Sequence, residues 1–377
     1  MYPLRMACQR RFEALNDIFT GTYMVWNKSL IGIDIGSSSV KICELSRSGK
    51  LLKNLCIQQL PGPAIYDGEI RDPDMLRQLI IKQLKENKFN LKGKRAAIAV
   101  SGSGVMIKRC LLTPEDDSDI EEQAFYEAKQ IFENDIDELL VRYTKIGEPT
   151  GDGRIPFLII GARRDIVEQN VGLIKSIGLK TGVIDCSAIA IANSFEHNYP
   201  IANQLVILAN IGLSSTQIIV SYNGEFLYTR EIPIGGMNYN ASIMEKLGVD
   251  EDNSEVLKLS ASHGEQEHEG QILEALSQVN EKIASEVSTT LHFFLENEDY
   301  PENMTKQGQI FLMGGASRTS GLDSTIAAIL EMPVQFANPF HRINHNKSGY
   351  SADYILNQGH LYGVSLGLAL RSFGDHD

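Results

Sequence analysis

Apolar and polar positions alternate in short runs from Leu30 onward, and this pattern predicts a mixed α/β protein. LIGIDIG is an apolar run that ends at a glycine, SVKICEL alternates, and GKLLKNLCIQQL follows a polar turn. These runs predict three consecutive antiparallel strands. Asp72 then precedes Pro73, and apolar residues recur at helical spacing up to Leu84, which predicts a helix with Asp72 as its N-cap. KRAAIAV and VMIKRCLL predict two more strands.

The composition turns acidic after residue 112, and this shift indicates a new module. We expect it to contain an acidic helix, strands near 140–145 and at FLIIGA, a helix at RRDIVEQNVGLIKSIG and a strand at TGVID. A further helix follows from Cys186. The pattern predicts a compact α+β insert within the first part of the chain.

One pattern occurs twice. IDIGSSSVKICELSRSGKLL starts at Ile33, and ANIGLSSTQIIVSYNGEFLY repeats its apolar strand, turn and alternating strand 176 positions later. In this alignment Asp34 matches Asn210, and Gly36 matches Gly212. A repeat this long is not a solenoid unit, so we interpret it as a duplicated lobe rather than as two unrelated hairpins.

Helical patterns and one more strand follow the second copy. Apolar residues step by three or four from Ile272 to Leu295, which predicts a long helix. QIFLMGG predicts a strand, residues 322–330 a helix, and HLYGVSLGLALRSF a closing helix.

The glycine and serine turns suggest a chemistry. A strand that ends in a tight Gly-Ser-Ser turn presents backbone N–H groups and small hydroxyls at one point, which suits phosphate oxygens. Each copy of the repeat supplies one such turn, and GGAS at 314–317 adds a third close approach of backbone. Together they predict a polyphosphate site.

These motifs resemble those of a known superfamily. GIDIGSSSVK and NIGLSST look like the two phosphate motifs of the actin-like ATPases, and LMGGAS looks like their adenosine motif. The position of the insert resembles that in the PilM and FtsA families. YDGEIRDPDMLRQLI, FLIIGARRDIVEQNVGLIKSIGL and GHLYGVSLGLALR resemble the PilM family of type IV pilus assembly proteins in particular.

The resemblance implies an α/β actin-like ATPase fold. Two duplicated RNase H-like lobes would surround a nucleotide cleft, with an FtsA-type α+β insert, an SHS2 domain, in the first lobe. The expected divisions are an N-terminal arm at 1–29, the first lobe at 30–112, the insert at 113–184, a connecting helix at 185–203, the second lobe at 204–358 and a C-terminal helix returning to the first lobe at 359–377. The arm is expected to be disordered or to precede a true start at Met24.

By the same resemblance the chain would bind ATP and Mg²⁺. Asp34 and Asn210 occupy the metal positions, with Asp34 acting through water because a hard cation prefers oxygen ligands. The implied nucleotide-binding residues are Gly36, Ser37, Ser38, Ser39, Lys41, Gly212, Ser214, Ser215, Thr216, Gly235, Gly236, Glu255, Lys258, Gly314, Gly315 and Ser317.

Some of these assignments have structural alternatives. Lys41 could be an exposed strand lysine, and Glu255 with Lys258, three apart on a helix, could be a solvated salt bridge. Asp185 stands where related ATPases place a water-orienting group, but it equally suits a helix N-cap. Asn210 replaces the usual aspartate and removes a charge that helps to hold hydrated Mg²⁺. We therefore expect slow or absent ATP hydrolysis.

Charge and cysteine usage limit the partners. The 35 Lys and Arg against 48 Asp and Glu give a net charge of −13, which argues against nucleic acid. Five scattered cysteines without a CxxC pair fit a reducing cytoplasm. Polar residues interrupt the uncharged stretch at 198–224, so we expect no transmembrane helix and no direct membrane insertion.

Residues 115–138 hold eleven acids and one lysine. Cytoplasmic tails beside a membrane span are rich in Lys and Arg, so this segment suits such a tail. The resemblance implies the tail of a PilN-like inner-membrane protein as partner, besides other pilus assembly proteins and self-association. The chain would then be an ATP-binding scaffold, cytoplasmic and peripheral at the inner membrane through its partner.

Two other functions are compatible with the fold. An FtsA-like division filament usually ends in an amphipathic membrane-binding helix, which is not evident after RSFGDHD. A small-molecule kinase needs a general base at the cleft, and neither lobe shows one. A scaffold of pilus assembly remains the favoured hypothesis.

Overall fold

The computed structural model of the chain divides into two compact units. Unit 1 comprises Met1–Ala190, Ile343–Tyr350 and Val364–Asp377, and unit 2 comprises Ile191–Arg342 and Ser351–Gly363. The structure describes residues 30–62, 64–113, 117–131, 138–146, 148–261, 268–297, 308–346 and 348–371. The expected N-terminal arm lies outside these residues.

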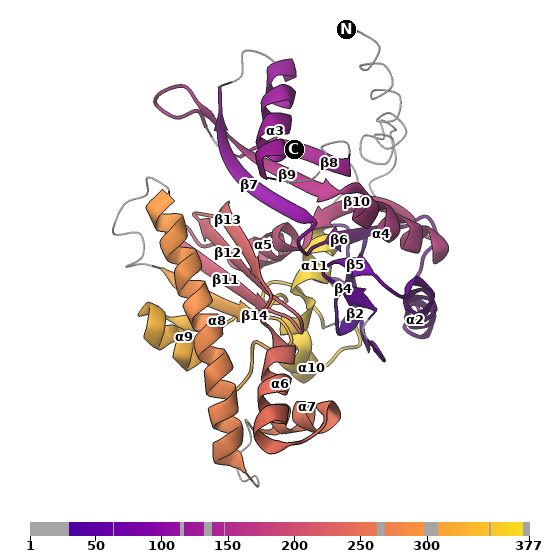
Figure 1. The fold of residues 1–377 in the computed structure, drawn as a ribbon. Helices are drawn as coiled ribbons and strands as arrows, with labels where there is room; N and C mark the ends of the chain where they lie inside the picture. The colour runs from indigo at the N-terminus through magenta and orange to yellow at the C-terminus, as the bar shows by residue number, and fades with distance from the viewer. Residues whose placement is uncertain are drawn as a thin grey trace. The chain divides into compact units, whose positions relative to one another are not determined.

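Unit 1 is built on a five-stranded sheet (Figure 1). Its strand order is β10-β6-β1-β2-β3, with β1 antiparallel to β2 and parallel to β6. The strands are β1 (Ile31–Ile35), β2 (Ser39–Leu45), β3 (Leu52–Gln59), β6 (Arg95–Val100) and β10 (Lys180–Cys186). A hairpin of β4 (Ile65–Tyr66) and β5 (Glu69–Ile70), which the sequence pattern did not predict, precedes α2.

Helix α2 (Pro73–Glu86) confirms its predicted start. The Asp72 side chain accepts a hydrogen bond from the Met75 N–H at 2.9 Å, which satisfies one of the unpaired donors of the first turn. Leu76, Ile80 and Leu84 are buried on one face, in a core shared with β1, β2 and α4 (Arg164–Ser176). The other face of α2 is exposed.

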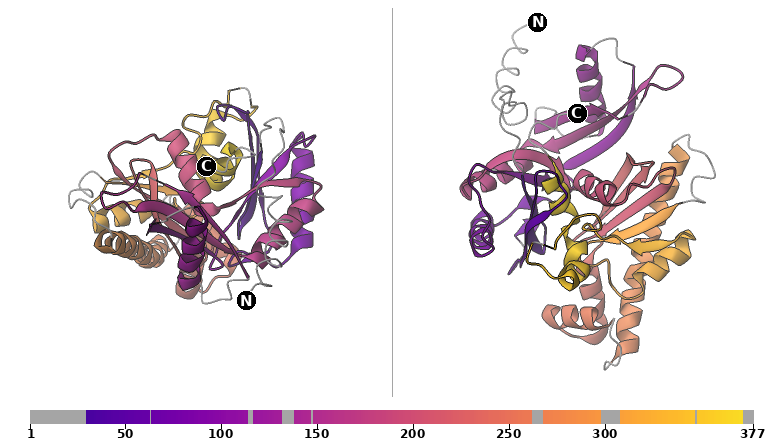
Figure 2. Two further views of the ribbon diagram at one scale, coloured as in Figure 1. Left: turned by 90° about the horizontal axis from the view of Figure 1, so that it is seen from above. Right: turned by 180° about the vertical axis from the view of Figure 1, so that it is seen from behind.

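The inserted module contains a three-stranded sheet, β7-β9-β8, with α3 on one face (Figure 2). Its elements are β7 (Val105–Leu112), α3 (Asp117–Ile131), β8 (Leu139–Lys145) and β9 (Ile155–Arg163). Strand β7 precedes the expected limit at 113 and pairs with β9, so the three-stranded sheet begins before that limit. Helix α4 packs both on the first-lobe core and against β8 and β9, and β10 pairs with β6.

Unit 2 repeats the sheet of unit 1. Its order, β13-β12-β11-β14-β15, places an antiparallel pair on one side of the first strand and a parallel pair on the other, as in unit 1. This shared topology confirms the predicted duplication. The strands are β11 (Leu205–Ile211), β12 (Thr216–Tyr222), β13 (Glu225–Ile232), β14 (Gln309–Met313) and β15 (Val334–Phe336).

Helices complete unit 2, and α8 covers one face of its sheet (Figure 1). They are α6 (Gly236–Leu247), α7 (Glu251–Ser260), α8 (Glu269–Asn297), α9 (Leu322–Leu330), α10 (Ala352–Gln358) and the 3₁₀ helix η3 (Gly359–Tyr362), and α5 (Ser187–Asn198) runs from unit 1 into unit 2. In the part of the chain that the structure describes, no helix is both long and apolar enough to cross a bilayer.

The closing helix differs from its prediction because it is divided into η3 and α11 (Gly363–Leu370). Two glycines, Gly32 on β1 and Gly367 on α11 itself, let α11 pack closely on its neighbours in unit 1. A Cβ on Gly32 would lie 2.1 Å from the Ser365 carbonyl oxygen, and one on Gly367 would lie 1.8 Å from that of Ala190. Only glycine permits backbones to approach this closely.

Candidate nucleotide-binding site

The first phosphate turn connects β1 to β2 in unit 1. The Gly36 N–H donates to the Ser39 carbonyl at 3.0 Å, which closes the turn around Ser37 and Ser38. Asp34 and Lys41 face each other across the two strands, with Oδ2 and Nζ 3.4 Å apart. Only 13% of the Lys41 side chain is exposed, so it is not a solvated strand lysine.

Lys41 reaches back over this turn. Its Nζ lies 3.3 Å from the position that a Cβ on Gly36 would occupy. An ammonium group therefore stands beside the glycine of the turn, where a bound phosphate would need positive charge. Among the described residues, Lys41 forms an ion pair with Asp34 alone.

The second turn, between β11 and β12 in unit 2, has the same backbone geometry. The Gly212 N–H donates to the Ser215 carbonyl at 2.8 Å, the equivalent of the bond in the first turn. The facing strand pair is Asn210 and Gln217, which is neutral. The buried Thr216 hydroxyl donates to the carbonyl of Ile234 at 2.7 Å, so Thr216 holds the turn rather than presenting its hydroxyl outward.

Glu231 on β13 is a neighbour that sequence reasoning missed. The Ser215 hydroxyl donates to Glu231 Oε1 at 2.6 Å, and the Gln217 amide donates to Oε2 at 3.1 Å. The Ser215 hydroxyl, which was predicted to bind phosphate, is thus hydrogen-bonded to a carboxylate. The register of the folded sheet, with Glu231 opposite Gln217, brings this carboxylate to the turn.

The first residues of α6 form hydrogen bonds with the second turn. Gly236 N–H donates to the Gly212 carbonyl and Met237 N–H to the Leu213 carbonyl, both at 2.9 Å. A Cβ on Gly235 would lie 2.7 Å from the Gly212 carbonyl oxygen, which is closer than side chains approach. Gly235 is therefore required for this contact, which forms a glycine border beside the second turn.

Lys258 of α7 also points to this border. Its side chain is 6% exposed, and its Nζ is 2.5 Å from Glu255 Oε2 and 3.5 Å from a Cβ placed on Gly236. The Asn240 amide donates to the same Glu255 oxygen at 2.9 Å. A buried lysine in a network with α6 differs from the solvated salt bridge that was the alternative.

The GGAS segment follows β14. Gly314 has a φ of +92°, and a Cβ there would lie 2.4 Å from the Ile211 carbonyl oxygen. The Ala316 N–H donates to that carbonyl at 3.0 Å, so the segment is fastened to the end of β11. Ser317 is fully buried and its hydroxyl donates to the Gly314 carbonyl at 2.7 Å, which makes it part of the turn; Gly315 lies at the same turn.

Asp185 is buried in unit 1 near the end of β10. Its Oδ1 accepts a hydrogen bond from the adjacent Cys186 N–H at 2.8 Å, and its Oδ2 lies 3.3 Å from an Arg371 guanidinium nitrogen. Burial raises the pKa of Asp185, and the charge of Arg371 acts in the opposite direction. Arg371 lies 186 positions away, and no local signal in the sequence indicates this partner.

The predicted residues thus belong to two groups. Unit 1 carries Asp34, Asp185 and the first turn, and unit 2 carries the second turn and its glycine borders. Among the described residues no group of three or more His, Cys, Asp or Glu could hold a metal ion. A magnesium ion at Asp34 would therefore take most of its ligands from phosphate and water.

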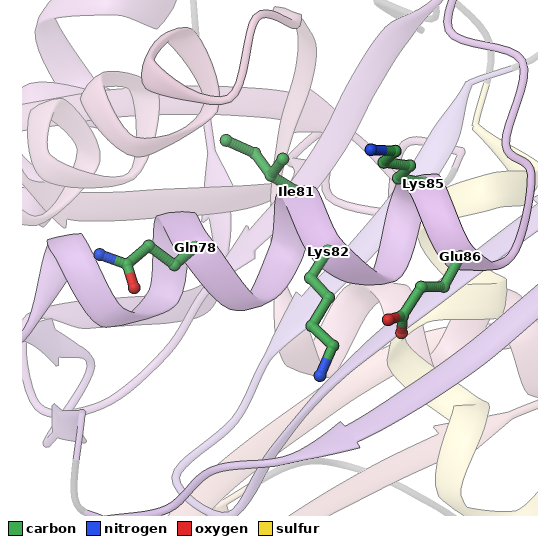
Figure 3. Close-up of a pocket in the computed structure, with 5 residues that line it drawn as sticks. All are labelled: Gln78, Ile81, Lys82, Lys85 and Glu86. Atoms are coloured by element: carbon green, nitrogen blue, oxygen red, sulfur yellow. The ribbon is translucent and has the colours of Figure 1, made fainter.

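One surface pocket lies elsewhere. It is shallow and open, and its lining residues all come from α2: Gln78, Ile81, Lys82, Lys85 and Glu86 (Figure 3). None of them belongs to the predicted nucleotide site.

Comparison with known proteins identifies the family. The family model described as the type IV pilus assembly protein PilM matches residues 32–373. The chain belongs to the PilM family. The match covers both copies of the repeat and the insert, and it confirms the family that the sequence motifs indicated.

Solved structures confirm the fold. A chain of a PilM-PilN type IV pilus biogenesis complex aligns with a TM-score of 0.80 and 23% identity, covering 91% of this chain and 98% of that one. The ethanolamine utilization protein EutJ from Carboxydothermus hydrogenoformans aligns with a TM-score of 0.56 and 17% identity, covering 98% of this chain and 99% of that one. MreB 5 of Spiroplasma citri bound to AMPPNP aligns with a TM-score of 0.51 and 14% identity, covering 90% of this chain and 94% of that one. The two-lobe actin-like ATPase fold of the PilM family is therefore shown.

Proposed function

We propose that this protein is an ATP-binding scaffold of type IV pilus assembly. The observation that carries the proposal is the turn built twice, closed by Gly36 to Ser39 in unit 1 and by Gly212 to Ser215 in unit 2. Such turns suit phosphate, and the PilM family supplies the cellular process. Membership in that family favours this function over a division filament or a small-molecule kinase.

In unit 1, Lys41 and the N–H groups of the first turn would bind phosphate oxygens. The Lys41 ammonium is already held near Gly36 by Asp34, so little side-chain ordering remains when phosphate arrives. Asp34 would face Mg²⁺ through water. This donor set, one cation and one carboxylate beside a phosphate turn, fits a Mg²⁺-bound polyphosphate.

In unit 2, the nucleoside would lie by the glycines at 235–236 and 314–315. These glycines leave backbone without side chains, and Lys258 and Glu255 place polar groups beside Gly236. The second phosphate turn would contribute backbone N–H groups, since the Ser215 hydroxyl is bonded to Glu231.

Isothermal titration of the full chain with MgATP tests this proposal. Lys258→Gln should weaken ATP binding. Lys246→Gln on the neighbouring α6, which removes a lysine paired with Glu274 of α8, should leave ATP binding unchanged. Thermal unfolding of both variants checks that each is folded. Absence of ATP binding by the unmodified protein would refute the nucleotide proposal.

Hydrolysis should be slow or absent. Asn210 and its partner Gln217 are both neutral, so unit 2 offers no carboxylate at the position that usually helps to hold hydrated Mg²⁺. Asn210→Asp should raise the measured rate of phosphate release. An unchanged rate in a variant that still binds ATP would show that the missing charge is not the cause.

The insert is the proposed docking site for the basic cytoplasmic tail of a PilN-like inner-membrane protein. Glu121, Glu122 and Tyr126 are exposed on α3, whose Ala124 and Ala128 are buried against the three-stranded sheet. Glu127 is partly buried and forms an ion pair with Lys108 at 2.9 Å. An exposed pair of acids with an aromatic ring suits a peptide rich in Lys and Arg.

Fluorescence anisotropy with a labelled tail peptide tests this docking. Glu121→Gln with Glu122→Gln should weaken binding, and the effect should fade at high salt. Glu281→Gln with Glu296→Gln, on α8 of unit 2, removes the same charge as a control. Equal binding by both double variants would contradict the α3 assignment. Attachment through such a tail would place the protein at the inner membrane.

A further inference from the structure

A second charged region of unit 1, opposite in sign to α3, has no role in the proposed site. Residues 77–95 contain seven basic residues and one acid, a net charge of +6 in a chain whose total is −13. They cover the exposed face of α2 and the loop that leads to β6. Such segregation is uncommon by chance in an acidic protein and points to an anionic partner.

Two of the seven are used inside the fold. Lys94 pairs with the buried Glu44, and an Arg95 guanidinium nitrogen donates to the Thr181 carbonyl at 3.4 Å. The other five are exposed, and two exposed lysines from neighbouring elements lie near the run. Lys175 is in the last turn of α4, where the Arg77 guanidinium donates to the Ser176 carbonyl. Lys180 is the first residue of β10 and pairs with Arg95 of β6. We name as the basic surface Arg77, Lys82, Lys85, Lys88, Lys92, Lys175 and Lys180.

The basic surface lacks internal compensation. Within the described residues, none of these seven cations forms an ion pair with an acid, although Lys108, Lys246 and Lys258 elsewhere each do. Like charges on neighbouring elements repel one another, and an external anionic partner would relieve that repulsion. Glu86, the one acid of the run, extends to the same side of α2 as Lys82 (Figure 3).

The shape of the region favours an extended surface as partner. Helix α2 has 14 residues and is therefore about 21 Å long. Ile81, 37% exposed, lies among the cations, and Lys82 and Lys85 extend to different sides of the helix (Figure 3). The depression beside them is shallow and open, so a peptide would find no enclosing groove. Because the apolar face of α2 packs on the protein core, a contact with a bilayer would be electrostatic and made by the exposed basic residues.

We propose that the basic surface docks directly on an anionic lipid bilayer. Basic residues near such a surface gain electrostatic attraction that extends over about one Debye length, roughly 8–10 Å at physiological salt. The contact is peripheral, with headgroup phosphates bound by lysines and Ile81 at the headgroup level. The acidic α3 lies well apart from α2 in Figures 1 and 2, so the bilayer attracts one end of unit 1 and repels the other.

Vesicle co-sedimentation of the full chain tests this docking. The vesicles contain phosphatidylcholine alone or with about one third phosphatidylglycerol, at about 0.05 M and about 0.5 M salt, which changes the Debye length severalfold. One variant combines Lys82→Gln, Lys85→Gln, Lys88→Gln and Lys92→Gln. The matched control combines Arg47→Gln, Lys50→Gln, Lys145→Gln and Lys282→Gln, which are also exposed and remove the same charge.

The unmodified protein and the control should bind the anionic vesicles at low salt and release them at high salt. The four-lysine variant should bind at least tenfold more weakly, with an unchanged melting temperature and unchanged affinity for the tail peptide. Equal vesicle binding by the two variants would overturn the proposal. So would absence of vesicle binding by the unmodified protein, and parallel samples with polyglutamate or polyuridine would then reveal an acidic peptide or RNA as the partner class.

Discussion

The two phosphate turns share a backbone but differ in their side chains. Each turn is closed by a glycine N–H to a serine carbonyl three positions later, at 3.0 Å in unit 1 and 2.8 Å in unit 2. The facing strand pair is charged in unit 1, with Asp34 and Lys41, and neutral in unit 2, with Asn210 and Gln217. The two copies thus share the backbone geometry of the turn, while the charges lie in one copy.

The surroundings of the turns differ as well. Each turn is bonded by the residues that follow β3 or β13: the Leu60 N–H donates to the Ser38 carbonyl at 2.8 Å, and the N–H groups of 236 and 237 donate to the second turn. A Cβ on Gly36 would meet the Lys41 ammonium at 3.3 Å, whereas a Cβ on Gly235 would meet backbone at 2.7 Å. The first turn therefore carries a lysine beside its glycine, and the second is closely packed and bonded to Glu231. Three pairs of substitutions test this difference.

The largest effect is expected for Lys41→Gln. Loss of a charge-assisted bond to phosphate, worth about 1.5–3 kcal/mol, should weaken ATP binding by about tenfold to a hundredfold. Gln217→Ala at the equivalent position of unit 2 should change it much less. Calorimetric titration of the two variants measures both effects, and equal losses would mean that the turns contribute alike.

The next largest effect is on the free energy of unfolding, which should differ between substitutions at the two turns. Gly235→Ala forces a Cβ to within 2.7 Å of the Gly212 and Leu213 carbonyl oxygens, and should lower the free energy of unfolding by about 1–3 kcal/mol. Gly36→Ala should lower it by only about 0.5 kcal/mol or less, because the flexible Lys41 ammonium can move. Urea denaturation measures the difference. A larger loss from Gly36→Ala would contradict the conclusion that a side chain fits beside the Lys41 ammonium.

The smallest effect is expected for Glu231→Gln. This change removes a negative charge beside the second turn and weakens the hold on the Ser215 hydroxyl, so ATP affinity should rise about threefold to tenfold, or about 0.7–1.4 kcal/mol. Glu225→Gln, at the opposite end of the same strand, provides the control. A fall in affinity would show that Glu231 itself contacts the bound Mg²⁺ and nucleotide.

Much of the fold could be predicted from local patterns. Apolar alternation located β1, β2 and β3, and Asp72 with Pro73 marked the start of α2, because strand and helix periodicity and capping depend on neighbours in the chain. The limits of the insert could not be read in this way. Strand β7 has the pattern of any strand, and only its hydrogen bonds to β9 assign it to the module.

The predicted site shows the same division. Glycine positions such as Gly235 and Gly314 were found because a turn motif lies within a few residues. Glu231, Asn240 and Arg371 were missed because each reaches the site from another element, through strand register, helix packing or the closing segment.

The sequence by itself determined the duplicated strand-turn-strand pattern, the type of each turn and the family. These depend on residue order over short distances, where backbone preference and periodicity decide the structure. The tertiary structure alone decided which charges meet. In the folded protein Lys41 forms an ion pair with Asp34, and the Ser215 hydroxyl forms a hydrogen bond with Glu231. The lysines of the basic surface form no ion pair among the described residues. Electrostatic interactions depend on distance in space, so no spacing along the chain could specify them.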